Sequence, residues 1–561
     1  MKPLRSSLEP VARLTSLSWT CNLKSSLSRL KLSECFIAVS LFVVSLLYLS
    51  LFRRYTFLDP DEGIILQGAQ RILDGQVLYR DFFSFFTPGS YYFNALLFRS
   101  FGNTFLVART AVALIGAALA VLTYVLARRV CNRSMSLAVA VLMTLTALPF
   151  RFMVLHNWDS TLLACLALYC AVRWLEGSGA RWAFAAGSLV SLTGLFEQSK
   201  GAGLLLGLTL GFGIIGMRNR QYRSFFRSNQ IVPAIIGLVW PLAITIVYFA
   251  SRHALGTMLT DWLWPLQHYS TANRVPYGYQ NLSESARNTI FFSGSWGIRA
   301  VKLLAFSASL WIPVLPLFGI ALLPRLATMR KESRPQQWAY YVLLSGTVTG
   351  LLASVVAVRP DIVHFVYLQP VFFLMLAWIL GGQHIRGSIL QRASTAISCL
   401  AALSLLMMAT ILLLRVTGTH YTMITRRGAV DVSQKDQVID RVQVNAAPGD
   451  RILSYPYSSM LYYLTGTYSS TSFEYLQPGM HTHEQVLELL AQLEARPVRL
   501  VLYEPGFGEH IPTSWPNTKA SDLAHDPVAD YIAHEYKACE SLSSSDDFHF
   551  LLMVPRSFSC P

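Results

Sequence analysis

Long apolar runs recur along the chain as far as about residue 415 and then stop. Their lengths suit transmembrane helices, which need about 20 mainly apolar residues to cross a bilayer. The pattern predicts eleven spans, which cover residues 35–52, 104–127, 135–151, 159–175, 182–197, 201–217, 231–250, 299–323, 338–358, 363–381 and 394–415. Spans five and six look short, so the segment Glu197-Gln198-Ser199-Lys200 between them is expected near or below the outer membrane surface.

The loop after the first span, residues 53–103, has a helical pattern of its own. Ile64/Ile65, Gly68/Ala69 and Ile72/Leu73 repeat at helical spacing, and Gly75 supplies a helix stop signal. A second helix is predicted over the aromatic-rich residues 88–101, ended by Gly102. We therefore expect two short helices that lie in the membrane interface rather than a simple connector.

The pattern changes after residue 415, where helices and strands are expected to alternate. Amphipathic helices are predicted from Ser433 to about Val444 and from Thr482 to Leu493, with Thr482 and Gln485 at capping-box spacing. Strands are predicted over Arg451–Tyr455, Val498–Tyr503 and Phe548–Val554. Residues 416–561 should thus form a small soluble α/β domain.

Composition and charge support a membrane protein. The chain is 53% hydrophobic and only 14% charged, whereas a soluble protein carries about 25% charged residues. Its formal net charge is +15, but the basic residues fall in short clusters between spans, which argues against nucleic-acid binding. The clusters follow the second, sixth, eighth and tenth spans, at Arg128–Arg133, Arg218–Arg227, Arg325–Arg334 and Arg386–Arg392.

These clusters all lie on one side of the membrane if the N-terminus is cytoplasmic. Residues 1–34 then form a cytoplasmic tail before an uncleaved first span, residues 35–415 form the transmembrane domain, and residues 416–561 lie outside the cytoplasm. None of the eight cysteines has metal-site spacing. Cys539 and Cys560 are the two cysteines of the C-terminal region, and a chain that doubles back around the last strand would let them form a disulfide; two free thiols are the alternative.

An acidic cluster, Asp59-Pro60-Asp61-Glu62-Gly63, begins the first predicted interfacial helix. Asp59, Pro60 and Glu62 stand at N-cap, N1 and N3 spacing, which is the capping-box pattern with proline in its favoured position. Helix-start chemistry therefore explains Asp59 and Glu62 but leaves Asp61 without a capping role. Asp61 is the leading catalytic candidate, with an interaction with the helix dipole or a loop role as the alternative.

The first loop also carries motifs of a known family. Asp61-Glu62-Gly63 is followed by Gly-x-x-x-Tyr-Arg-Asp-Phe-Phe over residues 75–83, by Pro-Gly-x-Tyr-Tyr over residues 88–92, and by Phe101-Gly102. The chain resembles the GT-C membrane glycosyltransferases of the protein O-mannosyltransferase and lipid A aminoarabinose transferase type, in a broad bacterial branch. The resemblance covers the first ten spans and is strongest over residues 55–110.

This resemblance implies transfer of a sugar from a polyprenyl-phosphate carrier to an acceptor at the outer face of the bacterial inner membrane. It maps the family's Asp-Glu pair onto Asp61 and Glu62, with the aspartate as base, and an acidic residue of the second outer loop onto Asp159. Where the aminoarabinose transferases carry Glu-Lys-Pro-Pro, this chain has Phe86-Thr87-Pro88-Gly89. A metal ligand and a phosphate-contacting lysine are thus missing there, so no cofactor is assigned, and a requirement for a divalent metal is left open.

Other charged residues of the outer loops are candidates for substrate binding. Lys200 and Arg359 are predicted to contact the carrier phosphate, and His364 to donate to it, since the departing lipid phosphate needs cations or hydrogen-bond donors. The alternatives are an ion pair of Lys200 with Glu197 and an interfacial role for His364. Asp159 is either an N-cap or an acceptor-positioning group. Two further candidates for substrate binding, Arg80 and Asp81, are adjacent, and an ion pair between them is the favoured interpretation.

The sequence thus predicts a mainly α polytopic membrane protein of GT-C type with a small C-terminal α/β domain. Its predicted activity is an inverting glycosyl transfer from a polyprenyl-phosphate sugar, with Asp61 as general base. The acceptor is a lipid, a glycan or a protein, and membrane lipids are the other partners. The rival interpretation is a non-catalytic transporter or flippase of lipid-linked glycans, which should carry charges deep in several spans and repeated halves. A glycan polymerase or ligase shares the chemistry and differs in acceptor.

Overall fold

The structure is a computed structural model. It describes residues 17–561 except 178, 219–221, 223–227, 270, 271, 382–387, 476, 546 and 547, and except residues 312–334 other than 314, 317 and 320. Most of the predicted basic clusters after spans six, eight and ten, and the first sixteen residues of the predicted tail, therefore lie outside the described residues. The rest of that tail is helical from Leu17 onward.

A helix occupies the position of every predicted span. Seven of the described helices are long and apolar enough to cross a membrane, and the full count of eleven crossings stays a prediction. Span six was predicted to be short, but its helix begins at Gln198 and has 21 residues. The helices of this bundle are α1 (Leu17–Ser50), α4 (Phe105–Ala127), α5 (Arg133–Phe150), α6 (His156–Leu175), α7 (Ala180–Phe196), α8 (Gln198–Arg218), α9 (Ser228–Ser251), α12 (Trp296–Trp311), α14 (Pro335–Val358), α16 (Gln369–Gly381) and α17 (Ser388–Thr417).

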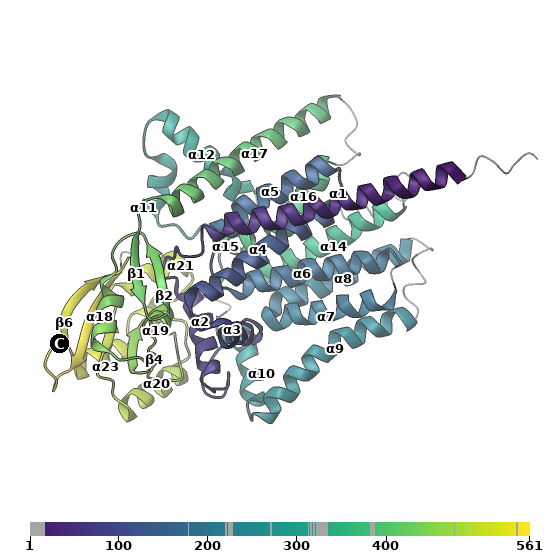
Figure 1. The fold of residues 1–561 in the computed structure, drawn as a ribbon. Coiled ribbons are helices and arrows are strands. Elements are labelled where there is room, and N and C mark those ends of the chain that lie inside the picture. Colours follow the sequence, from purple (N-terminus) through teal and green to yellow (C-terminus); the bar gives the residue numbers. More distant parts are fainter. Residues whose placement is uncertain are drawn as a thin grey trace, which may run out of the picture.

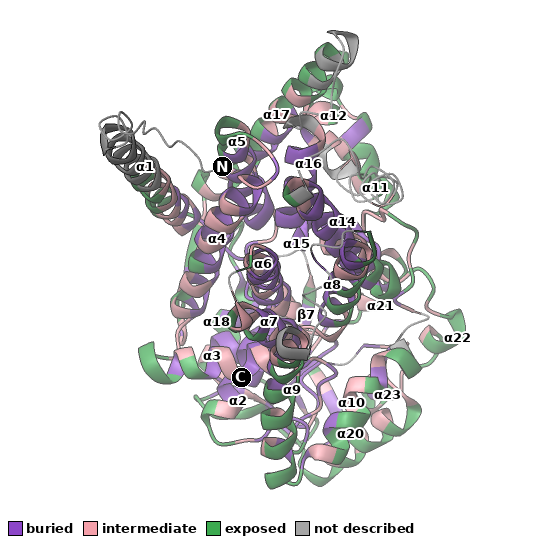
Figure 2. Cartoon of the chain, turned by 90° about the vertical axis from the view of Figure 1, so that its right-hand side faces the viewer, coloured by how far each residue is buried: buried purple, intermediate pink, exposed green. Residues whose placement is uncertain are grey.

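The bundle has a buried centre and a peripheral layer of exposed helices. Figure 2 shows α4, α6, α14 and α16 largely buried, whereas α1, α9 and α17 lie at the edge with much of their surface exposed. The apolar side chains on that exposed surface fit contact with lipid tails. At the centre, glycines let two helices approach closely: a Cβ on Gly203 or Gly207 of α8 would lie 2.3 or 2.4 Å from a backbone carbonyl oxygen of α14. Small residues at such seams are typical of membrane helix pairs.

The two predicted interfacial helices are present and lie at one end of the bundle, beside the C-terminal domain (Figure 1). They are α2 (Pro60–Leu73) and α3 (Gly89–Phe101). Each ends as predicted, because Gly75 and Gly102 adopt positive φ angles of 92° and 97°. The same end holds the short helices α10 (Leu255–Trp264), α11 (Glu284–Arg287) and α15 (Ile362–Tyr367), with π-helical turns over Pro265–Tyr269 and Asn288–Phe292.

Ion pairs lie at the opposite end of the bundle. Arg128, in the turn between α4 and α5, pairs with Glu34 of α1 at 3.4 Å. Arg129 of the same turn pairs at 3.0 Å with Glu176, which follows α6. The Tyr340 hydroxyl of α14 donates to Glu176 as well. This basic turn is thus separated from the acidic cluster of α2 by the length of the bundle, as the predicted topology requires.

The C-terminal domain combines a five-stranded mixed sheet with short helices. The strand order is β4-β3-β5-β7-β6, with β3 parallel to β4 and β5, and β7 antiparallel to β5 and β6. Strands β1 and β2 form a separate antiparallel hairpin. The segment around Tyr55 pairs with β2 through backbone hydrogen bonds of Asp431. The strands are β1 (Tyr421–Thr425), β2 (Gly428–Val432), β3 (Arg451–Tyr455), β4 (Tyr468–Ser469), β5 (Val501–Tyr503), β6 (Tyr536–Ser543) and β7 (His549–Pro555).

Local signals located most of this domain correctly. The predicted strands correspond to β3, β5 and β7, and Thr482 and Gln485 form the predicted capping box. The predicted Cys539–Cys560 disulfide is present. The helices are α18 (Gln437–Asn445), α19 (Ser459–Thr465), α20 (His483–Ala495), α21 (Phe507–Ser514), α22 (Ala520–Leu523) and α23 (Pro527–Glu535).

Candidate active site

The acidic cluster starts α2, and its three carboxylates have three different environments. Asp59 is the N-cap, and its carboxylate accepts the backbone N–H of Asp61 at 3.0 Å. The Asp59 carboxylate also pairs with Arg151, which follows α5, at 3.1 Å. Pro60 takes the first helical position, where its missing N–H costs nothing. The cap predicted for Asp59 is confirmed.

Asp61 is partly exposed and faces the C-terminal domain. The hydroxyl of Tyr457, from the loop between β3 and α19, donates a hydrogen bond to its Oδ1. Burial and the neighbouring Asp59 carboxylate raise the pKa of Asp61, and the Tyr457 hydroxyl, Arg151 and His364 offset part of that rise. A carboxylate with a raised pKa is a stronger base than an ordinary aspartate.

Glu62 does not complete the capping box, so that part of the helix-start interpretation is wrong. Its fully buried carboxylate binds Arg109 of α4 in a two-point contact, with Nε–Oε1 and Nη2–Oε2 distances of 2.6 and 2.5 Å. It also accepts the backbone N–H of Val154 at 2.8 Å. Glu62 thereby ties α2 to α4 and to the segment after α5. These contacts occupy both carboxylate oxygens, so Glu62 positions α2. A catalytic role for Glu62 stays a prediction.

Asp159 is not an N-cap, because α6 begins at His156 and its N-cap position is Leu155. Instead, the buried Asp159 carboxylate accepts a 2.5 Å hydrogen bond from the hydroxyl of Ser90 in α3. Ser90 lies inside the Pro-Gly-x-Tyr-Tyr motif. The preceding Gly89 packs against α7, since a Cβ there would lie 2.5 Å from the Phe196 ring. This motif therefore fixes α3 against α6 and α7.

Lys200 is buried at the start of α8, where protein acceptors surround its ammonium group. Nζ donates to the Asn157 carbonyl oxygen at 3.0 Å and to the Ser160 and Thr161 hydroxyls at 2.8 and 3.1 Å. It also pairs with Glu197 at 2.8 Å, which is the alternative that the sequence left open. Contact of Lys200 with a carrier phosphate remains a prediction, and it requires at least one of these bonds to be exchanged.

Arg359 has a similar set of partners in the turn before α15. Its guanidinium donates to Asp361 at 2.6 Å, to the Asn273 and Asn281 side chains at 2.8 Å each, and to the Ser514 carbonyl oxygen at 2.5 Å. Arg359 thus links an outer loop to the C-terminal domain. Its predicted contact with a phosphate likewise requires these bonds to open.

His364 lies one turn into α15 and is about one-quarter exposed. Its Nδ1 is 2.7 Å from Asp361, and its backbone N–H donates to the same oxygen. Burial disfavours the charged form of Asp361, but His364 and Arg359 outweigh it and hold its pKa well below the usual range. His364 also interacts electrostatically with Asp61. This interaction links a predicted substrate-binding residue to the leading base.

Arg80 and Asp81 form the expected ion pair with each other, with contacts of 2.9 and 2.8 Å. The Arg80 side chain, together with the backbone N–H of Val77, holds the pKa of Asp81 below its usual value. The pair stabilises the tight turn after α2, and contact of either residue with substrate stays a prediction.

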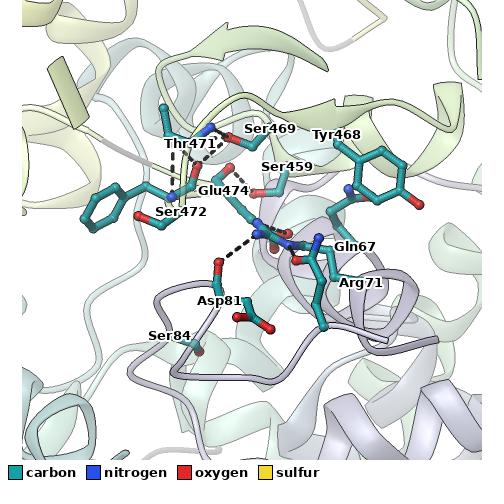
Figure 3. Close-up of polar contacts among 12 residues, drawn as sticks. Gln67, Arg71, Asp81, Ser84, Ser459, Tyr468, Ser469, Thr471, Ser472 and Glu474 are labelled. Atoms are coloured by element: carbon teal, nitrogen blue, oxygen red, sulfur yellow. Dashed lines mark hydrogen bonds and ion pairs between the residues drawn. The ribbon is translucent and has the colours of Figure 1, made fainter. Parts of the chain in front are cut away.

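The C-terminal domain is clamped onto the first loop. A Cβ on Gly63 would lie 2.1 Å from the backbone nitrogen of Met460, so the Asp-Glu-Gly glycine allows α19 to rest directly on α2. Figure 3 shows Arg71 of α2 reaching to Glu474 of that domain and to the backbone of Asp81. Burial raises the pKa of Glu474 to about 7, and Arg71 offsets part of that rise.

The structure therefore gathers part of the predicted site. Asp61 interacts electrostatically with His364, and Asp159 interacts electrostatically with Lys200. Arg80 and Asp81 do not join them. Sequence reasoning missed Arg109, Arg151 and Tyr457. No motif contains them, so the sequence offered only the chemistry of their side chains as a signal. The described residues contain no group of three or more His, Cys, Asp or Glu side chains suited to a metal ion.

No protein-family model matches the chain, and no curated protein matches it. The crystal structure of ArnT from Cupriavidus metallidurans bound to undecaprenyl phosphate is 13% identical over 93% of this chain and 99% of that chain, with a TM-score of 0.50. The archaeal oligosaccharyltransferase AglB from Archaeoglobus fulgidus, in complex with an inhibitory peptide and a dolichol-phosphate, is 13% identical over 94% of this chain and 75% of that chain, with a TM-score of 0.48.

The similarity to ArnT extends over nearly the whole of both chains and includes the C-terminal domain. It agrees with the mainly helical bundle, the membrane-spanning helices and the small sheet domain described above. The protein is accordingly a multi-pass membrane protein with the fold of the GT-C glycosyltransferases.

Proposed function

We propose that the protein is an inverting glycosyltransferase that moves a sugar from a polyprenyl-phosphate carrier to an acceptor at the outer face of the membrane. The observation that carries the proposal is the position of Asp61. It is a partly exposed carboxylate with a raised pKa, at the start of an interfacial helix, at the junction of the bundle and the C-terminal domain. The GT-C fold supports it, and the similar ArnT structure holds undecaprenyl phosphate.

The chemistry needs one base and no covalent intermediate. Asp61 removes the proton of the acceptor hydroxyl as its oxygen attacks the anomeric carbon. The bond from that carbon to the acceptor oxygen forms while the bond to the phosphate oxygen breaks, so the configuration inverts and the electron pair leaves on the lipid phosphate. General-base catalysis of this kind contributes about 10²–10⁴-fold.

Surrounding residues hold this base in place. Asp59 caps α2 and pairs with Arg151, while Glu62 anchors the same turn to Arg109. Asp159 holds the motif of α3 through Ser90. His364, which interacts electrostatically with Asp61, is the proposed donor to the substrate. A base held by three separate elements is kept in one geometry, which lowers the cost of reaching the transition state.

We place the protein in a bacterial inner membrane, with the N-terminus in the cytoplasm and the C-terminal domain outside. The basic turn after α4 lies at the end of the bundle opposite α2, which supports this orientation. Its partners are then a polyprenyl-phosphate sugar as donor and a lipid, glycan or protein as acceptor.

Replacing the base tests the proposal. Asp61→Asn should fold normally and lose about 10²-fold or more of the transfer rate, because an amide cannot take the acceptor proton. Asp59→Asn is the matched control two residues away. It weakens the pair with Arg151 and should mainly lower stability. Transfer is measured with purified protein and a lipid-linked sugar donor. A well-folded Asp61→Asn protein with full activity would rule out Asp61 as the base.

A further inference from the structure

A narrow cavity of about 30 Å³ lies at the end of the bundle that holds α2, beside the first turn of that helix. Its apolar wall comes from the outer ends of α1, α5 and α17. Asp59, Glu62, Arg109, Arg151 and Arg415 form its polar part. The cavity thus joins an apolar surface to a charged patch within two residues of Asp61.

The charges in this cavity favour an anion. Glu62 is neutralised by Arg109, and Asp59 is paired with Arg151. Arg415 remains as a third cation, and its guanidinium rests 4.0 Å from the centre of the Phe57 ring. Three arginines against two carboxylates leave one positive charge. One negative charge is what a lipid phosphodiester carries.

Two arginines of the cavity, Arg151 and Arg415, have donors to spare, unlike Arg109 and the other cations discussed above. The Nε of Arg151 is buried and has no hydrogen-bond partner among the described residues. Arg415 is exposed in the last turn of α17, so its side chain can turn toward a ligand without breaking a strong contact. Lys200 and Arg359, by contrast, already donate to several protein acceptors each.

The position suits a lipid ligand. Only 17% of the apolar stretch of α1 and 28% of that of α17 is buried inside the protein, against 72% for α14. The cavity therefore lies at the ends of two helices whose exposed apolar surfaces fit contact with lipid. A phosphate that enters from this side keeps its chain in the bilayer and brings its sugar toward Asp61.

We infer that this cavity is the subsite for the phosphate of the polyprenyl carrier, with Arg151 and Arg415 as the residues that bind it. The inference rests on the proposed function for the identity of its ligand. The small volume of the cavity is consistent with this assignment, because only the phosphoryl oxygens enter the cavity and the sugar stays outside. Charge-assisted contacts from two guanidinium groups give such a site its affinity.

Carrier binding, measured without any transfer reaction, tests the inference. The full-length protein is placed in nanodiscs of phosphatidylcholine, and undecaprenyl phosphate is titrated by native mass spectrometry. Arg415→Gln should weaken binding at least tenfold. Val416→Trp, which fills the cavity without a change of charge, should weaken it as well. Arg252→Gln is the matched control, since Arg252 is an exposed arginine at the outer end of α9 that also rests on an aromatic ring, Tyr248, away from the cavity.

A parallel titration with phosphatidylglycerol distinguishes the carrier from an ordinary anionic lipid. Equal losses for both lipids would show a general lipid site and overturn the inference, as would unchanged carrier binding in both Arg415→Gln and Val416→Trp. The result is independent of the proposed base. If Asp61→Asn abolishes transfer while Arg415→Gln binds the carrier normally, the function stands and the phosphate site lies elsewhere.

Discussion

Removing the Tyr457 hydroxyl should change the pH dependence of the reaction. Tyr457→Phe keeps the ring among Tyr475, Phe507 and Trp515 and deletes only the donor to Asp61. A hydrogen bond to a charged group is worth about 1.5–3 kcal/mol. Loss of this bond therefore raises the pKa of Asp61, and each 1.4 kcal/mol lost lowers the ionised fraction on the acidic side about tenfold.

The sign of the effect follows from the role of the base. Asp61 must be ionised to accept a proton, so a higher pKa moves the acidic limb of the kcat/KM profile to higher pH. On the acidic side of that limb, kcat/KM of the variant is lower than that of the unmodified protein by about 10–100-fold, because a smaller fraction of Asp61 is ionised. At higher pH, where Asp61 is ionised in both proteins, the two rates should converge.

A tyrosine in the same domain provides the control. The Tyr455 hydroxyl donates to Asp526 at 2.9 and 2.8 Å, far along the chain from Asp61. Tyr455→Phe therefore removes a hydrogen bond of the same kind without touching the base, and its limb should stay in place. The assay is the transfer rate as a function of pH with a lipid-linked donor. A Tyr457→Phe profile lowered equally at every pH, with an unmoved limb, would refute the reasoning.

Three further outcomes are expected. Gly63→Ala should loosen the C-terminal domain and speed its proteolysis, because the added Cβ would lie 2.1 Å from the Met460 backbone nitrogen. Gly213→Ala is the control and should not change proteolysis, since its added Cβ meets open space. A reporter fused after residue 430 should be active only outside the cytoplasm, and cytoplasmic activity would overturn the topology. Intact-mass analysis of the unreduced protein after alkylation should show Cys539 and Cys560 unmodified, whereas two alkylated cysteines there would mean no bridge.

The features that the sequence predicted well are those that depend on neighbouring residues. The Asp59 cap, the stops at Gly75 and Gly102, and the capping box at Thr482 each involve groups only a few positions apart. The spans followed from runs of apolar residues, whose number and spacing are visible in any window of the chain. These signals depend on residues close together in the sequence, which is why the structure agrees with them.

Partners far apart in the sequence were not predictable in this way. Glu62 matched the capping pattern, but its carboxylate binds Arg109, which comes from another helix 47 residues later. Tyr457 meets Asp61 from 396 residues away, and nothing near either residue indicates the other. Lys200 was interpreted as an available cation because the sequence does not show that Ser160 and Thr161 surround it.

The contact between Tyr457 and Asp61 can form only late in synthesis of the chain. A ribosome makes the first loop early, and nearly four hundred residues follow before Tyr457 emerges. Until then the nascent chain carries its acidic cluster at the membrane without the domain that covers it. Chains cut short by truncation or stalled synthesis would thus carry Asp61 with its pKa unadjusted and its far side open to water. The surroundings that tune the proposed base are therefore complete only after the C-terminal domain has been made.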